Sequence, residues 1–365
     1  MKHISQKIAY VGQNDFVNTI FDESSIFFDI ETTGFSPATS TVYLIGCLRK
    51  QEDELMIDQF FAENKEDEKE VLEQFLALLS QSRTIISFNG IGFDLPFIKA
   101  KCVSYGISYS FSRFGYIDIF KEVSKLKSIL NLPNYKQKTI EQFLDIKRDD
   151  IYSGGELISV YETYIAMHNS EAERLLLLHN YEDVLGMLDL IPVLSYQKVL
   201  NGGFHIKSAE ISTYTAYDGT EEKEMILTLE NDYTLPKRMS FQCNDYYIIW
   251  NQNETRIRVP VYDGELKYFH ENYKDYFYLP EEDMAIHKSV ATFVDKDYRQ
   301  KAKASNCYTR KTSRFLPQFY PFITPVFQKN YKDKVSYFEL TNDFISSNKE
   351  LKRYIKHIFE HAMQK

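Results

Sequence analysis

The sequence predicts an α/β fold over residues 1–200, a mixed sheet flanked by helices, and a second domain of the α+β class over residues 201–365. Three observations support this prediction. Three strand-like apolar runs come early in the chain, and helical and strand-like patterns alternate after them. After the Asn- and Gly-containing stretch 201–205, the pattern changes to short strands. A chain of 365 residues also exceeds the usual length of one domain, so two domains are expected.

The elements of the first domain follow from the spacing of its apolar residues. Residues 26–30, 41–48 and 55–61 are apolar runs of strand length, and a Gly/Ser/Pro turn follows the first of them. Helical periodicity and short buried runs then predict, in order, 66–82 (helix), 83–88 (strand), 94–106 (helix), 114–119 (strand) and 170–195 (helix). The last helix opens with a capping box, Ser170 and Glu173. Three strands followed by this alternation are typical of a ribonuclease H-like α/β domain.

The second domain is predicted from short strand-like runs and one helical segment. The runs are 224–230, 245–251, 255–262 and 265–270. Asp263-Gly264, between the last two, is a typical turn of a β-hairpin. Residues 280–304 are expected to form one or two helices.

Composition and charge narrow the class of protein. A net charge of −9 argues against a protein that covers nucleic acid with uniform positive charge, but it leaves room for a local basic surface. The four cysteines are widely separated, as expected for reduced thiols inside a cell. The N-terminal segment lacks an apolar signal core, and no run approaches the roughly 18 apolar residues needed to cross a bilayer. We therefore expect a cytoplasmic protein without membrane contact.

Two acids at the end of the first strand suggest a bound cation. In SIFFDIETTGF, residues 25–35, Asp29 and Glu31 are two positions apart, so a strand places both side chains on one face. Their apolar neighbours offer no charge that would offset the repulsion between them. Asp94 follows a strand and a glycine turn, and Asp183 lies within an apolar helix. Sets of three or four carboxylates suit Mg²⁺ or Mn²⁺, and two such ions about 3.5–4 Å apart activate water against a phosphodiester.

Each acid also has a simpler structural explanation. Asp29 and Glu31 could mark a strand that leaves the core. Asp94 precedes a proline in the first helical turn and could cap that helix while keeping an oxygen free for a metal. Asp183 could lie on the solvated face of its helix. Their occurrence together, in this order, favours the metal site.

The stretches FFDIETTGF, FNGIGFDLPF and HNYEDVLGM resemble the three motifs of the DnaQ-like, or DEDD, 3′→5′ exonuclease superfamily, and more narrowly the YprB-type ribonuclease H-like proteins. The resemblance covers about residues 24–195, with the motifs in order and in the expected elements. It implies a ribonuclease H-like fold, two divalent ions and cleavage of phosphodiesters. The metal ligands that it implies are Asp29, Glu31, Asp94 and Asp183. The substrate contacts that it implies are Thr32, Thr33 and Gly34, with Asn89 as a weaker candidate.

The third motif departs from the pattern of the superfamily. A Tyr four positions before the last Asp, or a His five positions before it, usually orients the attacking water there. Here His179 stands four positions before Asp183, so the histidine has the spacing of the tyrosine. Positions four apart share a helix face, and an imidazole with a pKa near neutrality suits a general base. We expect His179 to be catalytic, with a buried structural histidine as the alternative.

Three further features each have two interpretations. Asp118 ends a strand and either supports the site or caps the next helix. Lys136 and Lys138 could contact phosphates, although a solvated lysine face is simpler. From Tyr298 to Lys332 the chain has no acid, and cationic residues are interleaved with aromatic ones, which suits binding of phosphates and stacking of bases. Alternatively, these aromatic residues form a core and the cations pack on the acidic first domain.

The sequence therefore predicts a metal-dependent nuclease, most simply a 3′→5′ exonuclease that cleaves single-stranded DNA or RNA with two Mg²⁺ or Mn²⁺ ions and His179 as the base. The alternatives are a catalytically weak nucleic-acid-binding protein, a structure-selective endonuclease, and an interaction scaffold without a nucleic-acid role. The unusual spacing of His179 motivates the first of these. The cost of a buried acid cluster without cations argues against it. No motif distinguishes DNA from RNA.

Overall fold

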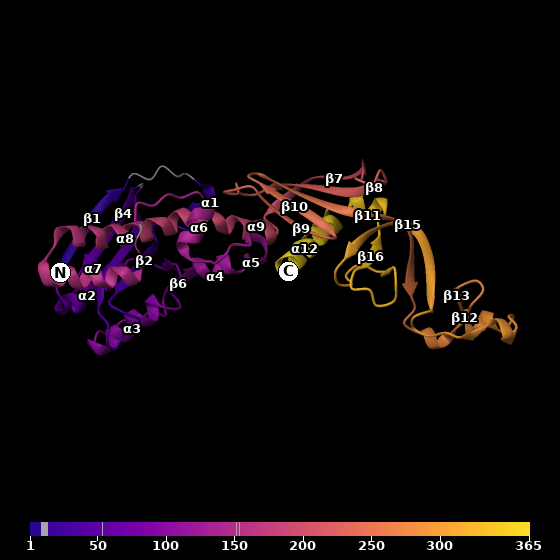
Figure 1. The fold of residues 1–365 in the computed structure, drawn as a ribbon, viewed down its shortest axis with the longest axis horizontal. Helices are drawn as coiled ribbons and strands as arrows, with labels where there is room; N and C mark the ends of the chain where they lie inside the picture. Colours follow the sequence, from indigo (N-terminus) through magenta and orange to yellow (C-terminus); the bar gives the residue numbers. More distant parts are fainter. Residues whose placement is uncertain (9–13, 53, 151, 153) are drawn as a thin grey trace. The chain divides into compact units, whose positions relative to one another are not determined.

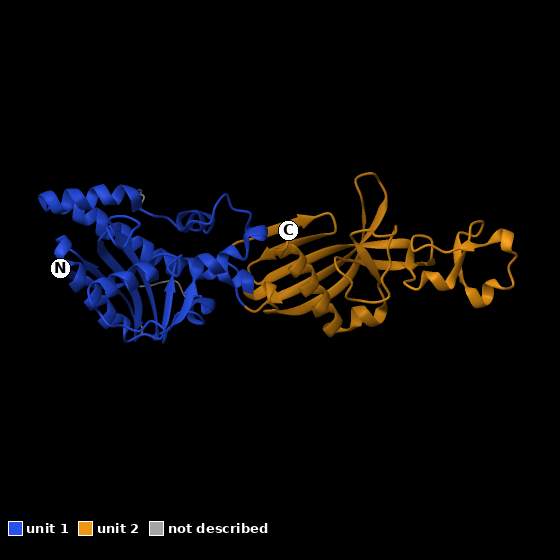
Figure 2. Cartoon of the chain, turned by 90° about the horizontal axis from the view of Figure 1, so that it is seen from below, with its two compact units in different colours: residues 1–197, 233–236 blue, residues 198–232, 237–365 orange. Residues whose placement is uncertain are grey.

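The computed structural model describes residues 1–8, 14–52, 54–150, 152 and 154–365. The chain divides into two compact units, which Figure 2 shows in different colours. Unit 1 comprises Met1–Gln197 with Tyr233–Pro236, and unit 2 comprises Lys198–Asp232 with Lys237–Lys365. Unit 1 is α/β and unit 2 is rich in β-structure, which confirms the predicted fold class.

Unit 1 is built on a six-stranded mixed sheet with the order β1-β4-β3-β2-β5-β6 (Figure 1). Its strands are β1 (Lys2–Ile8), β2 (Ser25–Thr32), β3 (Val42–Gln51), β4 (Glu54–Phe61), β5 (Thr84–Ser87) and β6 (Gly115–Asp118). The pairs β1–β4, β4–β3 and β3–β2 are antiparallel, whereas β2–β5 and β5–β6 are parallel. The strands predicted at 26–30, 41–48 and 55–61 are confirmed, and β1 was not predicted.

Nine helices of unit 1 connect or flank these strands in the described residues. They are α1 (Asp15–Asn18), α2 (Glu68–Leu79), α3 (Asp94–Ser104), α4 (Ile119–Ser124), α5 (Lys127–Leu130), α6 (Gln137–Phe143), α7 (Gly154–Met167), α8 (Ser170–Leu190) and α9 (Ser195–Leu200), the last of which extends into unit 2. The predicted capping box of α8 is wrong in its position. Asn169 is the N-cap, because its side chain accepts a hydrogen bond of 2.8 Å from the backbone N of Glu171. No helix in the described part of the chain combines the length and the apolar character that crossing a bilayer requires.

Helices α2 and α8 lie on opposite faces of the sheet of unit 1 (Figure 1). The ring of Phe28 in β2 packs on Phe75 of α2, with the centroids 5.2 Å apart. The next residue, Asp29, accepts a hydrogen bond from Asn180 of α8. Successive residues of a strand point to opposite faces, so β2 gives an apolar face to α2 and its acids to α8.

Unit 2 contains a seven-stranded antiparallel sheet in which β16-β15-β11-β10-β9 are neighbours and β8 pairs with both β11 and β7. Its strands are β7 (Phe204–Thr215), β8 (Glu221–Asn231), β9 (Met239–Cys243), β10 (Tyr246–Asn251), β11 (Glu254–Phe269), β15 (Tyr308–Gln318) and β16 (Ser336–Glu339). A smaller sheet contains β12 (Tyr276–Leu279), β13 (Met284–His287) and β14 (Gln300–Lys301), and the helices are α10 (Lys288–Ala291), α11 (Asn342–Ser346) and α12 (Asn348–Met363). The buried ring of Phe359 in α12 packs on Trp250 and Phe204 of the larger sheet.

Two predictions for unit 2 are wrong. Asp263-Gly264 is not a hairpin turn, because β11 continues through both residues and pairs there with β15, with Asp263 opposite Arg314. The segment 280–304 forms strands β13 and β14 and the short helix α10 instead of long helices. Both strands pair with β12, and this pairing outweighs the local preference for a helix.

The close approach of α8 to the sheet depends on Gly46 in β3. Gly46 lies opposite Asp29 across the β2–β3 pair. A Cβ atom on Gly46 would lie 2.7 Å from Cγ and 2.9 Å from Nδ2 of Asn180, whose side chain is fully buried. Glycine therefore leaves the room in which Asn180 fits between the helix and the strand.

We predict that Gly46→Ala lowers the free energy of unfolding of unit 1 by about 1–3 kcal/mol, because the added methyl group overpacks this contact. The measurement is urea denaturation. Gly115→Ala in β6 is the matched control, since its Cβ would find its nearest atom, Oγ1 of Thr84, at an ordinary 3.6 Å. Equal effects of the two substitutions would contradict the prediction.

Candidate metal centre

β2 and the start of α3 bring three of the predicted acids together. Asp29 and Glu31 leave the same face of β2, and Ile30 between them points the other way. Oδ1 of Asp94, the first residue of α3, accepts a hydrogen bond of 3.2 Å from the backbone N of Ile30. Asp94 therefore lies against the backbone that separates Asp29 from Glu31. Glu31 and Asp94 are buried, and Asp29 is half-buried.

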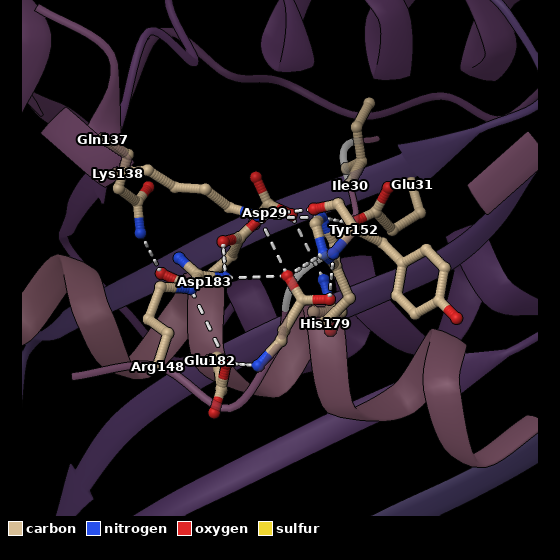
Figure 3. Close-up of polar contacts among 12 residues, drawn as sticks. Asp29, Ile30, Glu31, Gln137, Lys138, Arg148, Tyr152, His179, Glu182 and Asp183 are labelled. Carbon is tan, nitrogen blue, oxygen red and sulfur yellow. Dashed lines mark hydrogen bonds and ion pairs between the residues drawn. The ribbon is translucent and has the colours of Figure 1, made fainter. Parts of the chain in front are cut away.

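Helix α8 adds a fourth acid and a histidine to this group (Figure 3). Nε2 of His179 lies 3.1 Å from Oδ2 of Asp183 and 3.5 Å from Oε1 of Glu31. One donor atom from each of these three residues lies within 4.8 Å of the other two, close enough for one metal ion. Asn180 lies between His179 and Asp183 in the sequence of α8, and its Nδ2 donates a 3.2 Å hydrogen bond to Oδ2 of Asp29. The structure thus brings together all five residues predicted to be catalytic: Asp29, Glu31, Asp94, His179 and Asp183.

Three of the acids have raised pKa values because they are buried close to other acids. Burial raises the pKa of Asp29 well above its ordinary value, and the charges of the neighbouring acids raise it further. Burial raises the pKa of Glu31 to about 8, although the nearby His179 opposes the shift. Burial raises the pKa of Asp94 to about 7, despite the hydrogen bond from Ile30. Each shift means that the folded protein disfavours the charged form of the group.

Asp183 differs, because two cationic side chains already face it. Burial alone would raise the pKa of Asp183, but the hydrogen bond from His179 and the charges of His179 and Arg148 hold it below its ordinary value. His179 contacts Oδ2 and Arg148 contacts Oδ1. The same acids act on the histidine. Burial lowers the pKa of His179, but Asp183, Glu31 and Asp150 together raise it to about 9.

The guanidinium of Arg148 joins several acids of this region. Its Nη1 lies 3.1 Å from both carboxylate oxygens of Glu141, which is 1% exposed. Its Nη2 contacts Asp183, and its Nε lies 3.6 Å from Oε2 of Glu182. Figure 3 shows Arg148 between Asp183 and Glu182.

Five residues that contact the predicted site residues or their partners were not predicted from the sequence: Glu141, Arg148, Asp150, Asn180 and Glu182. Arg148 and Asp150 belong to the charged run KRDD, residues 147–150, which precedes α7. A dense run of charges next to a glycine pair was the available signal. Asn180 could have been found from its position, since it stands three residues before Asp183 on the same helix face.

The candidate substrate contacts are only partly gathered. Thr32 and Gly34 line a cavity of about 170 Å³ together with Glu31, Phe35 and Phe93. Thr33 and Asn89 are not among the described residues that line this cavity. Thr33 is engaged in the loop, where its Oγ1 accepts a hydrogen bond from the N of Thr41. Asn89 is exposed, and its backbone N donates to Asp118.

Asp118 and Lys138 have structural partners. The carboxylate of Asp118 caps α4 and accepts hydrogen bonds from the backbone N of Asn89 at 3.0 Å and of Ile91 at 3.3 Å, so it holds the loop of the second motif. Lys138 does not lie on a freely solvated face, because its Nζ is 3.0 Å from Oδ2 of Asp150. Asp94 is not the N-cap of α3, a position that Phe93 occupies.

The basic window, residues 298–332, offers fewer free cations and exposed rings than its sequence suggests. Arg310 pairs with Asp283, and Lys311 lies 2.6 Å from Glu339. The rings of Phe315 and Phe327 pack together in a buried cluster. These aromatic residues form a core, as one of the two interpretations predicted. Binding of nucleic acid by unit 2 stays a prediction.

The donor set fits a hard divalent cation. Four carboxylates provide oxygen ligands of the type that Mg²⁺ and Mn²⁺ prefer. Burial raises the pKa values of Asp29, Glu31 and Asp94, the charges of nearby acids raise them further, and a bound cation would favour the charged forms. Asp29, Glu31, Asp94 and Asp183 are therefore the candidate ligands.

We predict that Arg148→Met lowers the free energy of unfolding of unit 1 by about 3–5 kcal/mol, because it leaves the buried Glu141 without its cation. Arg174→Met is the matched control, since Arg174 pairs with Glu171 at the exposed start of α8. Its effect should be much smaller, because water screens an ion pair on the surface. Urea denaturation of both variants measures the difference, and losses of similar size would count against the role assigned to Arg148.

A family model agrees with this architecture. Residues 26–195 match the model of a family described as the RNase_H superfamily. No curated protein matches the chain.

Solved structures that align with it include the family B DNA polymerase of the archaeon Pyrobaculum calidifontis, at 16% identity and a TM-score of 0.39 over 48% of this chain and 26% of that one. E. coli exonuclease I in complex with a dT13 oligonucleotide aligns at 11% identity and a TM-score of 0.32, over 57% of this chain and 55% of that one. The chain thus spans about a quarter of the polymerase and about half of the exonuclease. The family match and the mixed sheet together indicate an RNase H-like fold for residues 26–195.

Proposed function

We propose that unit 1 is a metal-dependent nuclease, specifically a 3′→5′ exonuclease that hydrolyses single-stranded DNA or RNA with two Mg²⁺ or Mn²⁺ ions. One observation carries the proposal. Four carboxylates from β2, α3 and α8 converge, and burial disfavours the charged forms of three of them, Asp29, Glu31 and Asp94. A cluster of this kind is costly unless cations neutralise it. Hydrolysis of an anionic phosphodiester is a reaction that such cations promote.

The chain's own residues divide the work as follows. Asp29, Glu31, Asp94 and Asp183 hold the divalent ions. When bound, two such ions supply Lewis-acid activation of the phosphodiester and of water. His179 presents Nε2 to Glu31 and Asp183, where it can hold a proton or accept one. Asn180 fixes the orientation of the Asp29 carboxylate.

We assign the end of the substrate strand to the cavity beside Glu31. Thr32 and Gly34 line it, and Phe35 at its rim is 87% exposed. An exposed aromatic ring next to a phosphodiesterase site is suited to stack a base, which contributes about 1–3 kcal/mol without regard to sequence. The polarity of digestion in this proposal rests on the resemblance of the three motifs.

We predict that Mg²⁺ or Mn²⁺ raises the free energy of unfolding of unit 1. The increase should be about 2.7 kcal/mol when the concentration of the ion is a hundred times its Kd, and it should appear as a higher melting temperature. In chelator, Asp29→Asn should melt above the wild type, because it removes one of the mutually repelling acids. With the metal, this variant should gain less stability than the wild type. Glu23→Gln, an exposed acid just before β2, is the control and should follow the wild type under both conditions.

We predict that 5′-labelled DNA or RNA oligonucleotides are shortened stepwise from the 3′ end in Mg²⁺ or Mn²⁺ and remain intact in chelator. Asp29→Ala and Asp183→Ala should each lower the rate by at least about a hundredfold. Loss of a residue that only hydrogen-bonds to a metal ligand already lowers activity by about 10- to 100-fold, and loss of a ligand should cost more. The Glu23→Gln control should cleave at the wild-type rate.

The same assay separates the alternatives. A circular single-stranded substrate has no end, so an exonuclease leaves it intact and an endonuclease opens it. Binding in a gel-shift experiment without metal-dependent turnover would indicate a nucleic-acid-binding protein with an inactive site. If Asp29→Ala digests the oligonucleotides at the wild-type rate, the assignment of the site is wrong.

A further inference from the structure

A third acid contacts His179 on the side opposite Glu31 and Asp183, and none of the three sequence motifs contains it. Nδ1 of His179 is 2.7 Å from Oδ2 of Asp150, and both side chains are buried, at 4% and 8% exposure. The two residues are 29 positions apart, and the segment before α7 carries Asp150 to α8. The contact is short enough for a strong, charge-assisted hydrogen bond.

The carboxylate of Asp150 is itself held firmly. Lys138 of α6 places Nζ 3.0 Å from Oδ2, and the backbone N of Tyr152 donates a 3.0 Å hydrogen bond to Oδ1. The backbone N of Asp150 donates at 2.9 Å to Glu182, the neighbour of Asp183 on α8. Burial alone would raise the pKa of Asp150, but Lys138 and His179 lower it, so the group stays an anionic acceptor. Lys138 and Tyr152 therefore hold the Asp150 carboxylate, and Glu182 holds its backbone.

The other ring nitrogen of His179 faces the candidate metal centre. Nε2 lies 3.1 Å from Asp183 and 3.5 Å from Glu31. An imidazole that rotated by half a turn about its last side-chain bond would present carbon atoms to both sets of partners. The hydrogen bond of Asp150 selects one orientation of the ring, the one that directs Nε2 at the acids.

We propose that Asp150 is a positioning residue of this site, which accepts the N–H of Nδ1 and thereby fixes Nε2 of His179 against Glu31 and Asp183. This inference rests on the proposed nuclease function for its effect on turnover. It also gives a physical reason why a histidine at the four-residue spacing can serve this site, because the ring is held from behind by a segment outside the three motifs.

The first test compares Asp150→Asn with Asp149→Asn, which removes an exposed charge from the adjacent residue. Asp150→Asn should lower kcat by about 10- to 100-fold with KM nearly unchanged, because substrate binding does not involve the far side of the ring. Asp149→Asn should match the wild type. In a His179→Ala background, Asp150→Asn should have no further effect on kcat, because Asp150 acts through that ring. An equal loss in both backgrounds would overturn the proposal.

A second readout does not depend on activity. In protein labelled with ¹⁵N-histidine, the proton on Nδ1 should give a downfield, slowly exchanging NMR signal, because it is bonded to a buried carboxylate. The signal should be present in Asp149→Asn, absent from His179→Ala, and moved upfield in Asp150→Asn, because the neutral amide oxygen is a weaker acceptor than the carboxylate. An identical signal in Asp150→Asn and the wild type would overturn the proposal. If the wild type shows this signal but no metal-dependent turnover, the proposed function fails while the positioning bond stands.

A third variant covers the case in which Asp150→Asn does not fold. Lys138→Met leaves His179 and Asp150 in place and removes one anchor of the carboxylate, and Lys138 is exposed enough, at 39% of its side chain, to tolerate the change. It should lower kcat several-fold with KM unchanged. A several-fold loss of kcat in Lys138→Met with an unchanged Nδ1 signal would overturn the proposal, because the loss would then not act through the bond to His179.

Discussion

The repulsion among four carboxylates at the end of β2 is the constraint on which the site of unit 1 depends. Buried acids are tolerated only when donors or cations reach them. Donors from other elements meet this requirement here: Asn180 bonds Asp29, the backbone of Ile30 bonds Asp94, and Arg148 bonds Asp183. The close contact of α8 with the sheet follows from the same constraint, because Asn180 can reach Asp29 only where Gly46 leaves room for its side chain.

Neighbouring groups offset the burial of the four acids to different extents. Asp183 is neutralised on both oxygens and keeps a low pKa, whereas the pKa values of Asp29, Glu31 and Asp94 are raised. A divalent cation gains most from groups that the protein leaves unneutralised. Arg148 and His179 thus offset the burial of Asp183, whereas the raised pKa values of Asp29, Glu31 and Asp94 show that the burial of these three acids is not offset to the same extent.

Local patterns were reliable where burial and periodicity agreed. Strands β2, β3 and β4 and helices α3 and α8 were predicted correctly, because the spacing of their apolar residues is that of a strand or a helix, respectively. The patterns failed in unit 2, where strand pairing decided the structure. Asp263-Gly264 has the residues of a turn but lies inside β11, because β15 supplies a partner across from it. A single sequence does not show which distant strand provides that partner.

The sequence by itself determined which acids belong to the candidate site and which element carries each of them. That information is local, because the spacing of Asp29 and Glu31 on a strand, or of His179 and Asp183 on a helix, fixes which side chains share a face. Only the tertiary structure decided what surrounds them. Arg148 and Asp150 reach α8 from a charged segment about 30 positions away, and no local periodicity encodes a contact between an irregular segment and a helix face. The partners that orient and neutralise the site are therefore products of the fold.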